Sequence, residues 1–311
     1  MLSVVQILAV VGIVSLVLQL YRLLSFIWLY FLRPSTVHRY LHGPPAYALV
    51  TGASDGIGKA IAAELYNQGF NLILHGRNEA KLLNVVDQIR GSARARDVKY
   101  FFADASDADH DFERILAPFK DLNITVIVHN VGSSPLTREK INGLSKTDLM
   151  DIINRNAIFP LMVTHTLLTQ LHLASRTGPV LVQFIGSQAG ELSPARLAVY
   201  AGSKAFLKAL ARGLDTDERV WDTQTSVRFA YLNTGQVQSS TMRIPSSLAT
   251  PTSERYAEAV VARMGCGWRQ YCPYWMHSIQ AWCAQLLGES AADTFAAQAV
   301  ADLIAVHEKQ S

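Results

Sequence analysis

The chain has 311 residues, of which half are hydrophobic and 17% are charged, so it can bury a substantial core and is not expected to be disordered. Its formal net charge is only +3, without a long basic run or a stripe of aromatics among lysines, which excludes the usual signature of nucleic-acid binding. Cys266, Cys272 and Cys283 suit neither a disulfide framework nor a zinc site, so we expect reduced packing thiols and no bound metal.

The chain opens with an apolar segment. Residues 1–21 carry no charge, and residues 23–32 continue the apolar composition after the single Arg22. About 20 apolar residues suffice to cross a bilayer, and the basic start and small-residue cleavage site of a signal peptide are missing. We therefore predict that residues 1–32 form a retained membrane anchor, with an amphipathic helix lying in the membrane interface as the alternative.

Basic residues follow the apolar segment rather than precede it. Arg22, Arg33 and Arg39 all lie toward its C-terminal side, so the positive-inside tendency places the rest of the chain in the cytosol. The prolines within residues 33–46 favour an extended linker. We expect one folded domain to occupy residues 47–311.

From residue 47 onward, short β-branched or apolar runs alternate with longer amphipathic runs. This alternation is typical of a doubly wound parallel α/β sheet, the Rossmann-like arrangement. The expected strands are residues 48–51, 71–75, 98–102, 125–129, 180–185 and 226–232. A weakly patterned stretch, residues 239–253, predicts a loop able to fold over a substrate.

A glycine run lies between the first expected strand and the first helix. Missing side chains there allow a tight turn, close approach of the backbone to a pyrophosphate, and a helix N-terminus aimed at negative charge. This position in a doubly wound fold predicts a dinucleotide site. The expected contacts are Gly52, Ser54, Asp55, Gly56, Ile57 and Gly58.

The ends of the next two strands indicate which dinucleotide is bound. The second strand ends in His75-Gly76-Arg77-Asn78 and lacks the carboxylate that would bind the two ribose hydroxyls of NAD. Arg77 can pair with a 2′-phosphate instead, so we expect NADP(H). Asp104 ends the third strand where adenine would lie, although a helix cap is the ordinary role of such a residue.

A second group of candidate residues has a different chemistry. Tyr200 and Lys204 are four residues apart and share one face of a helix, where the ammonium can favour the ionised phenol. Ser187 stands at the end of a strand. Asn156 is a polar residue on an apolar helix stripe, four residues before Pro160, which cannot donate a hydrogen bond to the Asn156 carbonyl. Each residue alone has an ordinary structural reading, but together they favour catalysis.

In their order along the chain these motifs resemble the short-chain dehydrogenase/reductase superfamily: Thr51-Gly-x3-Gly-x-Gly58, Asn130-Val-Gly132, Asn156, Ser187 and Tyr200-x3-Lys204. The resemblance covers about residues 47–235. A finer resemblance, to membrane-bound very-long-chain 3-oxoacyl-CoA reductases and their 17β-hydroxysteroid dehydrogenase relatives, rests on the run from Thr51 to Ala60, on Tyr274-Trp-Met-His277 and on Trp282.

The resemblance implies roles for these residues. Tyr200 would protonate a carbonyl oxygen as hydride arrives from the nicotinamide, while Lys204 would hold the nicotinamide ribose and lower the phenol pKa. Ser187 would orient the carbonyl, and a water would link Asn156 to Lys204 in a proton relay. The remaining implied cofactor-site residues are Asn130, Val237 and Ser239.

Two positions depart from the family pattern. His129-Asn130 stands where the family commonly has Asn-Asn, and Thr234-Gly235 stands where it has Pro-Gly. Loss of the proline is expected to relax the turn that aims Val237 and Ser239 at the carboxamide, and so to weaken cofactor binding. Trp268, Tyr274 and Trp282 either line an acyl tunnel or, as is more ordinary, pack against the sheet.

The expected function is NADPH-dependent reduction of a lipid ketone, first of all 3-oxoacyl-CoA to 3-hydroxyacyl-CoA in very-long-chain fatty-acid elongation. A hydroxysteroid or other apolar ketone reductase is the alternative, and a non-catalytic NADP-binding scaffold is a third hypothesis. The anchor and the resemblance together predict the endoplasmic reticulum membrane, with the catalytic domain in the cytosol. The expected partners are that membrane, an apolar or acyl-CoA substrate, and a second copy of the chain.

Overall fold

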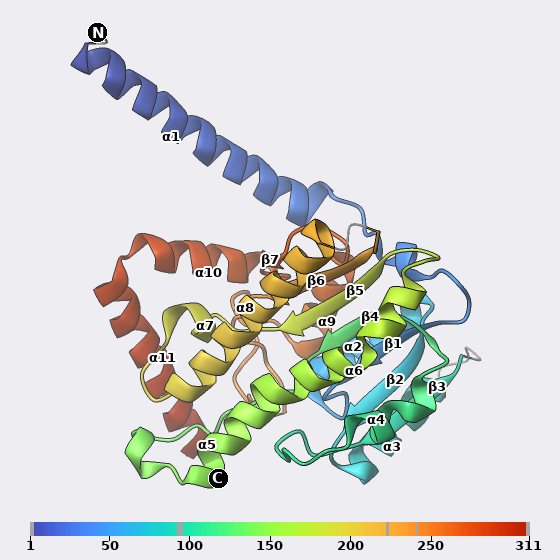
Figure 1. The fold of residues 1–311 in the computed structure, drawn as a ribbon. Coiled ribbons are helices and arrows are strands. Elements are labelled where there is room, and N and C mark those ends of the chain that lie inside the picture. The colour runs from blue at the N-terminus through green and yellow to red at the C-terminus, as the bar shows by residue number, and fades with distance from the viewer. Residues whose placement is uncertain (1–2, 92–95, 222–223, 241, 309–311) are drawn as a thin grey trace. The chain divides into compact units, whose positions relative to one another are not determined.

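A computed structural model describes residues 3–91, 96–221, 224–240 and 242–308. The chain divides into an N-terminal unit that ends at Ser35 and a larger unit that begins at Thr36. Within the larger unit, the described residues form a seven-stranded sheet of order β3-β2-β1-β4-β5-β6-β7, and each neighbouring pair is parallel (Figure 1). The prediction of a doubly wound parallel α/β fold is confirmed.

The strands are β1 Ala46–Val50, β2 Asn71–Gly76, β3 Val98–Phe102, β4 Asn123–His129, β5 Val180–Ile185, β6 Val227–Leu232 and β7 Gln270–Tyr271. The helices are α1 Val4–Ile27, α2 Gly56–Gln68, α3 Glu79–Arg90, α4 Phe112–Leu116, α5 Lys146–Ile153, α6 Phe159–Ala174, α7 Ala189–Leu192, α8 Ala198–Val220, α9 Ser253–Ala262, α10 Trp275–Leu286 and α11 Glu289–Glu308. All six expected strands are present. The additional strand β7 has only two residues, too few to show an alternating pattern.

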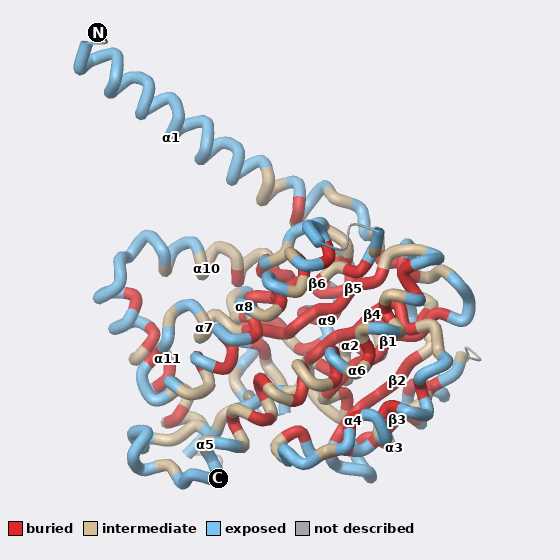
Figure 2. Tube along the Cα trace, in the orientation of Figure 1, coloured by how far each residue is buried: buried red, intermediate tan, exposed pale blue. Residues whose placement is uncertain are grey.

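The sheet has a hydrophobic core on each face, which explains why its central strands read as continuous apolar runs. In β1, Ala48 and Val50 join the core that α2 and α9 cover, whereas Tyr47 and Leu49 join the core that α6 and α8 cover. Figure 2 shows these buried strands running through the middle of the larger unit. Because all the strands are parallel, the loops after them meet at one edge, where doubly wound folds bind their ligands.

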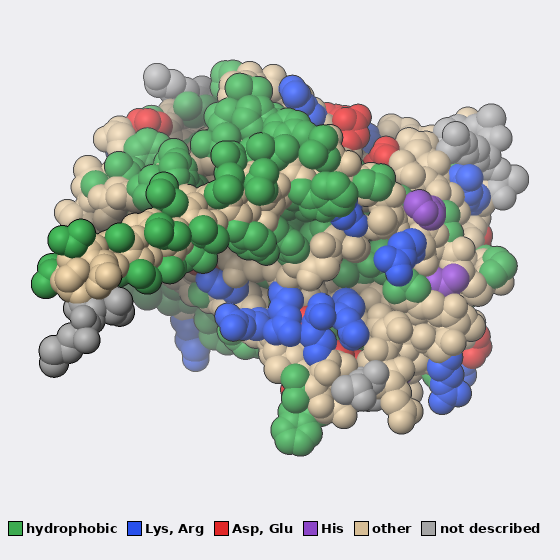
Figure 3. Space-filling view, turned by 90° about the horizontal axis from the view of Figure 1, so that it is seen from above, with side chains coloured by type: hydrophobic (Ala, Val, Ile, Leu, Met, Phe, Trp, Pro, Cys, Tyr) green, Lys and Arg blue, Asp and Glu red, His purple; other side chains and the backbone are tan. Residues whose placement is uncertain are grey.

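The N-terminal unit contains the apolar helix. Val4–Leu32 has a mean hydropathy of 2.3 in its most apolar window, and none of that window is buried, so it is a candidate membrane anchor. Hydrophobic side chains cover α1 along its length in Figure 3. Among the described residues, Lys146–Ala174 also has the length and composition of a membrane span, but 44% of its window is buried. Its α6 part packs into the core, so we interpret it as an internal helix.

The expected linker is folded in its second half. Val37–Tyr40 forms a 3₁₀ turn with both end residues buried, and the Thr36 hydroxyl donates a hydrogen bond to the Met264 carbonyl oxygen over 2.9 Å. The larger unit therefore begins at Thr36 rather than at residue 47. The prolines indicated that the anchor helix would stop, but they carried no information about Val37 and Tyr40 joining a core.

The three cysteines all lie among the described residues as thiols outside any disulfide, but they differ in burial. Cys272 is buried and Cys266 is partly buried, as expected of packing thiols, whereas Cys283 is exposed on α10. The packing prediction is therefore wrong for Cys283.

Candidate active site

The glycine run after β1 forms a tight turn whose backbone requires glycine. Gly52 and Gly56 have φ of +65° and +52°, in the left-handed region that side chains disfavour. A Cβ on Gly58 would lie only 2.2 Å from the Gly52 carbonyl oxygen. Asp55 caps α2 by accepting a hydrogen bond from the Gly56 N–H, so the turn leads directly into a helix N-terminus.

Two residues from neighbouring strands hold this turn in place. The Gly52 N–H donates to His75 Nδ1 over 3.2 Å, and Asn130 Nδ2 donates to the Thr51 and Gly52 carbonyl oxygens over 3.2 and 3.1 Å. His75 is buried beside Phe159, and burial lowers its pKa to about 4, so its ring is neutral at physiological pH. Asn130 therefore braces the loop, and His75 is a positioning residue that sequence analysis missed.

Arg77 and Asp104 lie together at the ends of β2 and β3. Their nearest side-chain atoms, Nη1 and Oδ2, are 3.7 Å apart, and the side chains are 66% and 47% exposed, so this ion pair is weak. The Asp104 carboxylate also accepts hydrogen bonds from the Ser106 hydroxyl and N–H. It thus shapes the local turn, while the Arg77 guanidinium remains exposed. Arg77 directly follows Gly76, which lies against the glycine loop, since a Cβ there would be 3.2 Å from Ser54 Cβ.

Ser187, Tyr200 and Lys204 come together at the end of β5 and the start of α8. The Ser187 hydroxyl is hydrogen-bonded to the Tyr200 phenol. Lys204 is almost fully buried, its Nζ lies 5.7 Å from the centre of the Tyr200 ring, and it donates to the Ile185 carbonyl oxygen over 2.9 Å. A hydroxyl, a phenol and an ammonium therefore converge in one small region.

The protonation equilibria of this group differ from the expected ones. Burial raises the pKa of Tyr200, and its hydrogen bond with Ser187 offsets only part of that rise. Burial also lowers the pKa of Lys204 to about 8, because the ammonium has lost its water. Lys204 therefore does not by itself lower the pKa of Tyr200 below its usual value, and the expected acidic phenol, which also needs the positive ring of the bound nicotinamide, stays a prediction.

Tyr231 on β6 fixes the backbone of Ser187. Its hydroxyl accepts a hydrogen bond from the Ser187 N–H over 3.0 Å and donates to the Ser187 carbonyl oxygen over 3.1 Å. The ring occupies the space beside Gly186, where a Cβ would lie 2.0 Å from Tyr231 Cζ. Tyr231 is thus a second positioning residue that the sequence pattern did not single out.

Asn156 lies in a π-helical turn, Asn154–Ile158, between α5 and α6. Its side chain is fully buried and makes two hydrogen bonds with Ser133, accepting from the N–H and donating to the carbonyl oxygen over 2.9 Å each. The amide side chain is therefore committed to the loop after β4. A Cβ on Gly132 would lie 2.7 Å from Asn156 Oδ1 and 2.9 Å from Lys204 Nζ, so the absence of a side chain at Gly132 lets both groups lie against its backbone.

The loop after β6 is held firmly, contrary to expectation. Thr234 Oγ1 is hydrogen-bonded to the Tyr256 hydroxyl over 2.6 Å, and the Gly235 N–H donates to His277 Nδ1 over 3.1 Å. The other ring nitrogen of His277 lies 3.1 Å from the Gln236 carbonyl oxygen, to which the neutral ring can donate. Side-chain hydrogen bonds thus take over the restraint that a proline would have given.

The two residues expected to contact the carboxamide lie along this loop. Val237 is buried in the core that α2 and α9 cover, and its contact with the cofactor stays a prediction. Ser239 lies against the glycine loop, since a Cβ on Gly56 would be 3.2 Å from Ser239 Cβ. The structure therefore brings the β6 loop and the β1 loop together.

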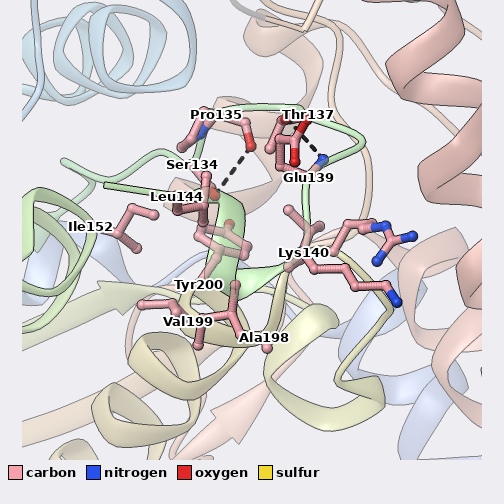
Figure 4. A pocket seen from close by; sticks show the side chains of 13 residues that line it. Ser134, Pro135, Thr137, Glu139, Lys140, Leu144, Ile152, Ala198, Val199 and Tyr200 are labelled. Carbon is pink, nitrogen blue, oxygen red and sulfur yellow. Dashed lines mark hydrogen bonds between the residues drawn. The ribbon is translucent and has the colours of Figure 1, made fainter. Parts of the chain in front are cut away.

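A pocket of about 150 Å³ adjoins Tyr200 (Figure 4). Its lining residues are Ser134, Pro135, Thr137, Glu139, Lys140, Ile141, Leu144, Ile152, Arg196, Leu197, Ala198, Val199 and Tyr200. Trp268 and Trp282 do not line it and are 46% and 48% exposed, so the packing alternative does not fit them, and their role in an acyl tunnel stays a prediction. Tyr274 is buried, which confirms the packing alternative for that residue.

Comparison with known proteins relates this site to a family. A model of the short chain dehydrogenase family matches residues 46–248. The very-long-chain 3-oxoacyl-CoA reductase of Kluyveromyces lactis is 34% identical over 250 residues, covering 78% of this chain and 71% of that protein. The enzyme of the same name from Podospora anserina is 31% identical over 242 residues, covering 76% of this chain and 69% of that protein.

Solved structures share the fold at low sequence identity. A short-chain dehydrogenase from Sphingobium yanoikuyae in complex with NADPH has a TM-score of 0.63 and 17% identity, covering 77% of this chain and 92% of that one. A 7β-hydroxysteroid dehydrogenase has a TM-score of 0.69 and 18% identity, covering 80% and 96%. Since the family model spans strands β1 to β6, the glycine turn and the Ser187, Tyr200 and Lys204 centre, the chain belongs to the short chain dehydrogenase family and is an NAD(P)-dependent oxidoreductase.

Proposed function

We propose that the chain is an NADPH-dependent ketoreductase that converts a 3-oxoacyl-CoA to the corresponding 3-hydroxyacyl-CoA. The observation that carries this proposal is the convergence of Ser187 and Lys204 on Tyr200, which lines a pocket. The names of the relatives at 31 and 34% identity support the choice of substrate. An intact centre of this kind argues against a scaffold that binds the cofactor without turning over.

The residues present fit a nicotinamide dinucleotide. The glycine turn presents backbone N–H groups and a helix N-terminus to the pyrophosphate, and the Arg77 guanidinium can pair with a 2′-phosphate. Gly132 lets the Lys204 ammonium lie against the loop after β4, and we assign this ammonium to the nicotinamide ribose. When bound, the reduced nicotinamide supplies the hydride that reaches the carbonyl carbon of the substrate.

The side chains of the centre then complete the reduction. The Ser187 hydroxyl donates a hydrogen bond to the substrate carbonyl oxygen, and Tyr200 transfers its proton to that oxygen as negative charge develops there. Protonated Lys204 favours the phenolate that remains. We assign the backbone carbonyl of Asn156, whose side chain is already committed, to the water that returns a proton through Lys204.

Substituting Arg77 is predicted to change the cofactor preference. Charged hydrogen bonds contribute about 1.5–3 kcal/mol each, so Arg77→Ala should raise the KM for NADPH by roughly 10- to 100-fold and leave that for NADH nearly unchanged. Steady-state kinetics with each cofactor measure this. Glu79→Gln, in the first turn of the neighbouring α3, is the matched control. An Arg77→Ala enzyme that loses NADPH and NADH affinity equally would contradict the assignment.

Substituting His277 is predicted to affect cofactor binding more than chemistry. His277→Ala leaves the Gly235 N–H and the Gln236 carbonyl without this partner, at about 1–3 kcal/mol for each buried group. Because the loop carries no reacting atom, the KM for NADPH should rise by about tenfold with a much smaller change in kcat. Trp282→Ala, on the exposed side of the same α10, is the control. A fall confined to kcat would show that the loop has a different role.

A substrate panel tests the proposed function as a whole. Purified enzyme and NADPH are supplied in parallel with 3-oxoacyl-CoA thioesters of increasing chain length and with ketosteroids, and cofactor oxidation is followed. The proposal expects the highest kcat/KM with the thioesters. Preference for the ketosteroids would establish the alternative substrate class, and bound NADPH without oxidation by any ketone would establish the scaffold.

We also propose that residues 1–32 anchor the enzyme in the endoplasmic reticulum membrane. The larger unit, which begins at Thr36 and carries the reductase site, then lies in the cytosol. The unburied apolar helix Val4–Leu32 and the basic residues that follow it support this arrangement. Protease treatment of sealed microsomes should digest the larger unit, and protection of it would place it in the lumen. Self-association stays a prediction, to be tested by crosslinking in the membrane.

A further inference from the structure

We propose that Lys140 and Arg196 form a cationic rim on the pocket beside Tyr200, and that this rim binds the phosphate groups of a coenzyme A thioester. The inference rests on the proposed function and deepens it, because it names what would distinguish a coenzyme A thioester from a neutral ketone at the same site. Both residues line the pocket, and both side chains are exposed.

These two cations have not been neutralised by the protein. Among residues 3–91, 96–221, 224–240 and 242–308, no ion pair or side-chain hydrogen bond involves Lys140 or Arg196. Nearby basic residues behave differently: Arg138 forms two 2.8 Å hydrogen bonds with Glu308, and Lys208 is paired with Glu191. Charge is therefore left available at the pocket, where a phosphate can use it.

The acidic residue that lines the same pocket does not cancel this charge. Glu139 is held by its N–H, which donates to Thr137 Oγ1 over 3.1 Å, and its carboxylate lies against the backbone of Gly143. A Cβ on Gly143 would be only 2.3 Å from Glu139 Oε2. In Figure 4 the Lys140 ammonium points away from the Glu139 carboxylate.

The backbone at Arg196 is a second, independent observation. Its φ is +69°, and Ser193 in the same loop has a φ of +46°. A left-handed conformation is costly for a long side chain, and glycine would adopt it without strain. Strain of this kind persists where a particular side chain is needed, and here the strained loop delivers a guanidinium to the pocket.

The other residues that line the pocket, and its size, fit a thioester whose coenzyme A part extends out of the pocket. The apolar residues Pro135, Ile141, Leu144, Ile152 and Leu197 suit the carbon chain near the reacting carbonyl. At about 150 Å³ the pocket is smaller than the ~300–1,000 Å³ of common ligand sites, so it holds only the reacting part of a long substrate. The pantetheine arm then carries the phosphates outward, to exposed cations rather than buried ones. Arginine binds phosphate through paired N–H groups and lysine as a point charge.

The test compares two thioesters of the same 3-oxoacyl chain, one of coenzyme A and one of N-acetylcysteamine, which lacks every phosphate. Lys140→Gln and Arg196→Gly should each raise the KM for the coenzyme A thioester by about 3- to 10-fold at unchanged kcat, and leave the N-acetylcysteamine thioester unaffected. Added salt should raise the KM of the wild type for the coenzyme A thioester, but not the KM of a double variant that carries both substitutions. Lys120→Gln, an exposed lysine just before β4 at the opposite edge of the sheet, is the matched control.

Arg196→Gly separates a lost charge from a damaged fold. Glycine relieves the positive φ, so this variant should melt at a higher temperature than the wild type even though its KM rises. If the variants showed an equal rise in KM for both thioesters, or no rise for either, the proposal that the cationic rim binds phosphate groups would be wrong.

A binding experiment separates failure of the rim from failure of the proposed function. Free coenzyme A is titrated by calorimetry into the full chain already saturated with NADPH, so that the phosphates of the ligand cannot report the cofactor site. Binding that weakens in the double variant supports the rim even if no thioester is reduced, a result that would overturn the proposed function alone. If the enzyme reduces thioesters but its affinity for coenzyme A is unchanged by both substitutions, the proposed rim would be wrong and the proposed function would stand.

Discussion

Tyr200→Phe is expected to lower the turnover number for ketone reduction by about 10³-fold or more, while the affinity for NADPH stays nearly intact. Positioned proton transfer contributes about 10²–10⁴-fold, and the phenol is the group placed to give its proton to the carbonyl oxygen. Removing one oxygen atom leaves the ring, its packing and the glycine turn unchanged. Cofactor oxidation measures kcat, and a fluorescence titration with NADPH measures binding.

Tyr47→Phe is the matched control for that variant. Tyr47 is buried, and its hydroxyl donates a hydrogen bond to Asp97. Both residues lie where strands begin, at the opposite edge of the sheet from the strand ends that carry the site. It should keep full activity. A Tyr200→Phe enzyme that turns over at the wild-type rate would show that another group gives the proton.

Lys204→Met is expected to abolish most activity and, at the same time, to stabilise the fold. Burial lowers the pKa of Lys204 from 10.5 to about 8, which corresponds to roughly 3 kcal/mol of penalty for keeping the ammonium charged inside the protein. Removing the ammonium removes this penalty, but the variant also loses the hydrogen bond to the Ile185 carbonyl, which costs about 1 kcal/mol of stability. Methionine should therefore raise the free energy of unfolding at neutral pH by about 2 kcal/mol, whereas kcat falls by at least 10²-fold.

The difference in stability between Lys204→Met and the wild type is expected to depend on pH. Below pH 8 both the folded and the unfolded wild type bind the proton on Lys204, so the full penalty applies. Between about pH 8 and 10.5 only the unfolded state binds it, so the wild type gains stability as the pH rises. Denaturant unfolding of the detergent-solubilised chain should thus show the advantage of Lys204→Met at pH 7 and its loss near pH 10.5. A variant that is less stable than the wild type at pH 7 would refute the account of a desolvated ammonium.

Local patterns in the sequence were enough to predict the architecture. The runs that became β3 and β5 were predicted with their observed bounds. β5 is a fully buried apolar run between polar loops, whereas β3 at the edge of the sheet is apolar but only partly buried. The glycine turn and the Tyr200 and Lys204 pair were also predictable, since a run of glycines between a strand and a helix and a four-residue helical spacing are visible in the local sequence.

Contacts that cross the sheet were not predictable in this way. His75, Tyr231 and His277 reach residues 23, 44 and 42 positions away, and the partner in each case is a backbone group, which carries no residue-type signal. The raised pKa of Tyr200 had the same origin: burial depends on the tertiary fold, whereas the sequence showed only the nearby Lys204. Arg196 escaped notice because nothing in its neighbours revealed a left-handed backbone.

The central claim is that hydride passes from a bound nicotinamide to a carbonyl held at Ser187 and Tyr200. The most direct measurement is a single turnover with NADPH that carries deuterium at the transferred position and a 3-oxoacyl-CoA, followed by mass spectrometry of the product. We predict one deuterium on the new alcohol carbon of the 3-hydroxyacyl-CoA, and none with the Tyr200→Phe enzyme over the same time. Saturated cofactor binding with no deuterium in any product would contradict the claim.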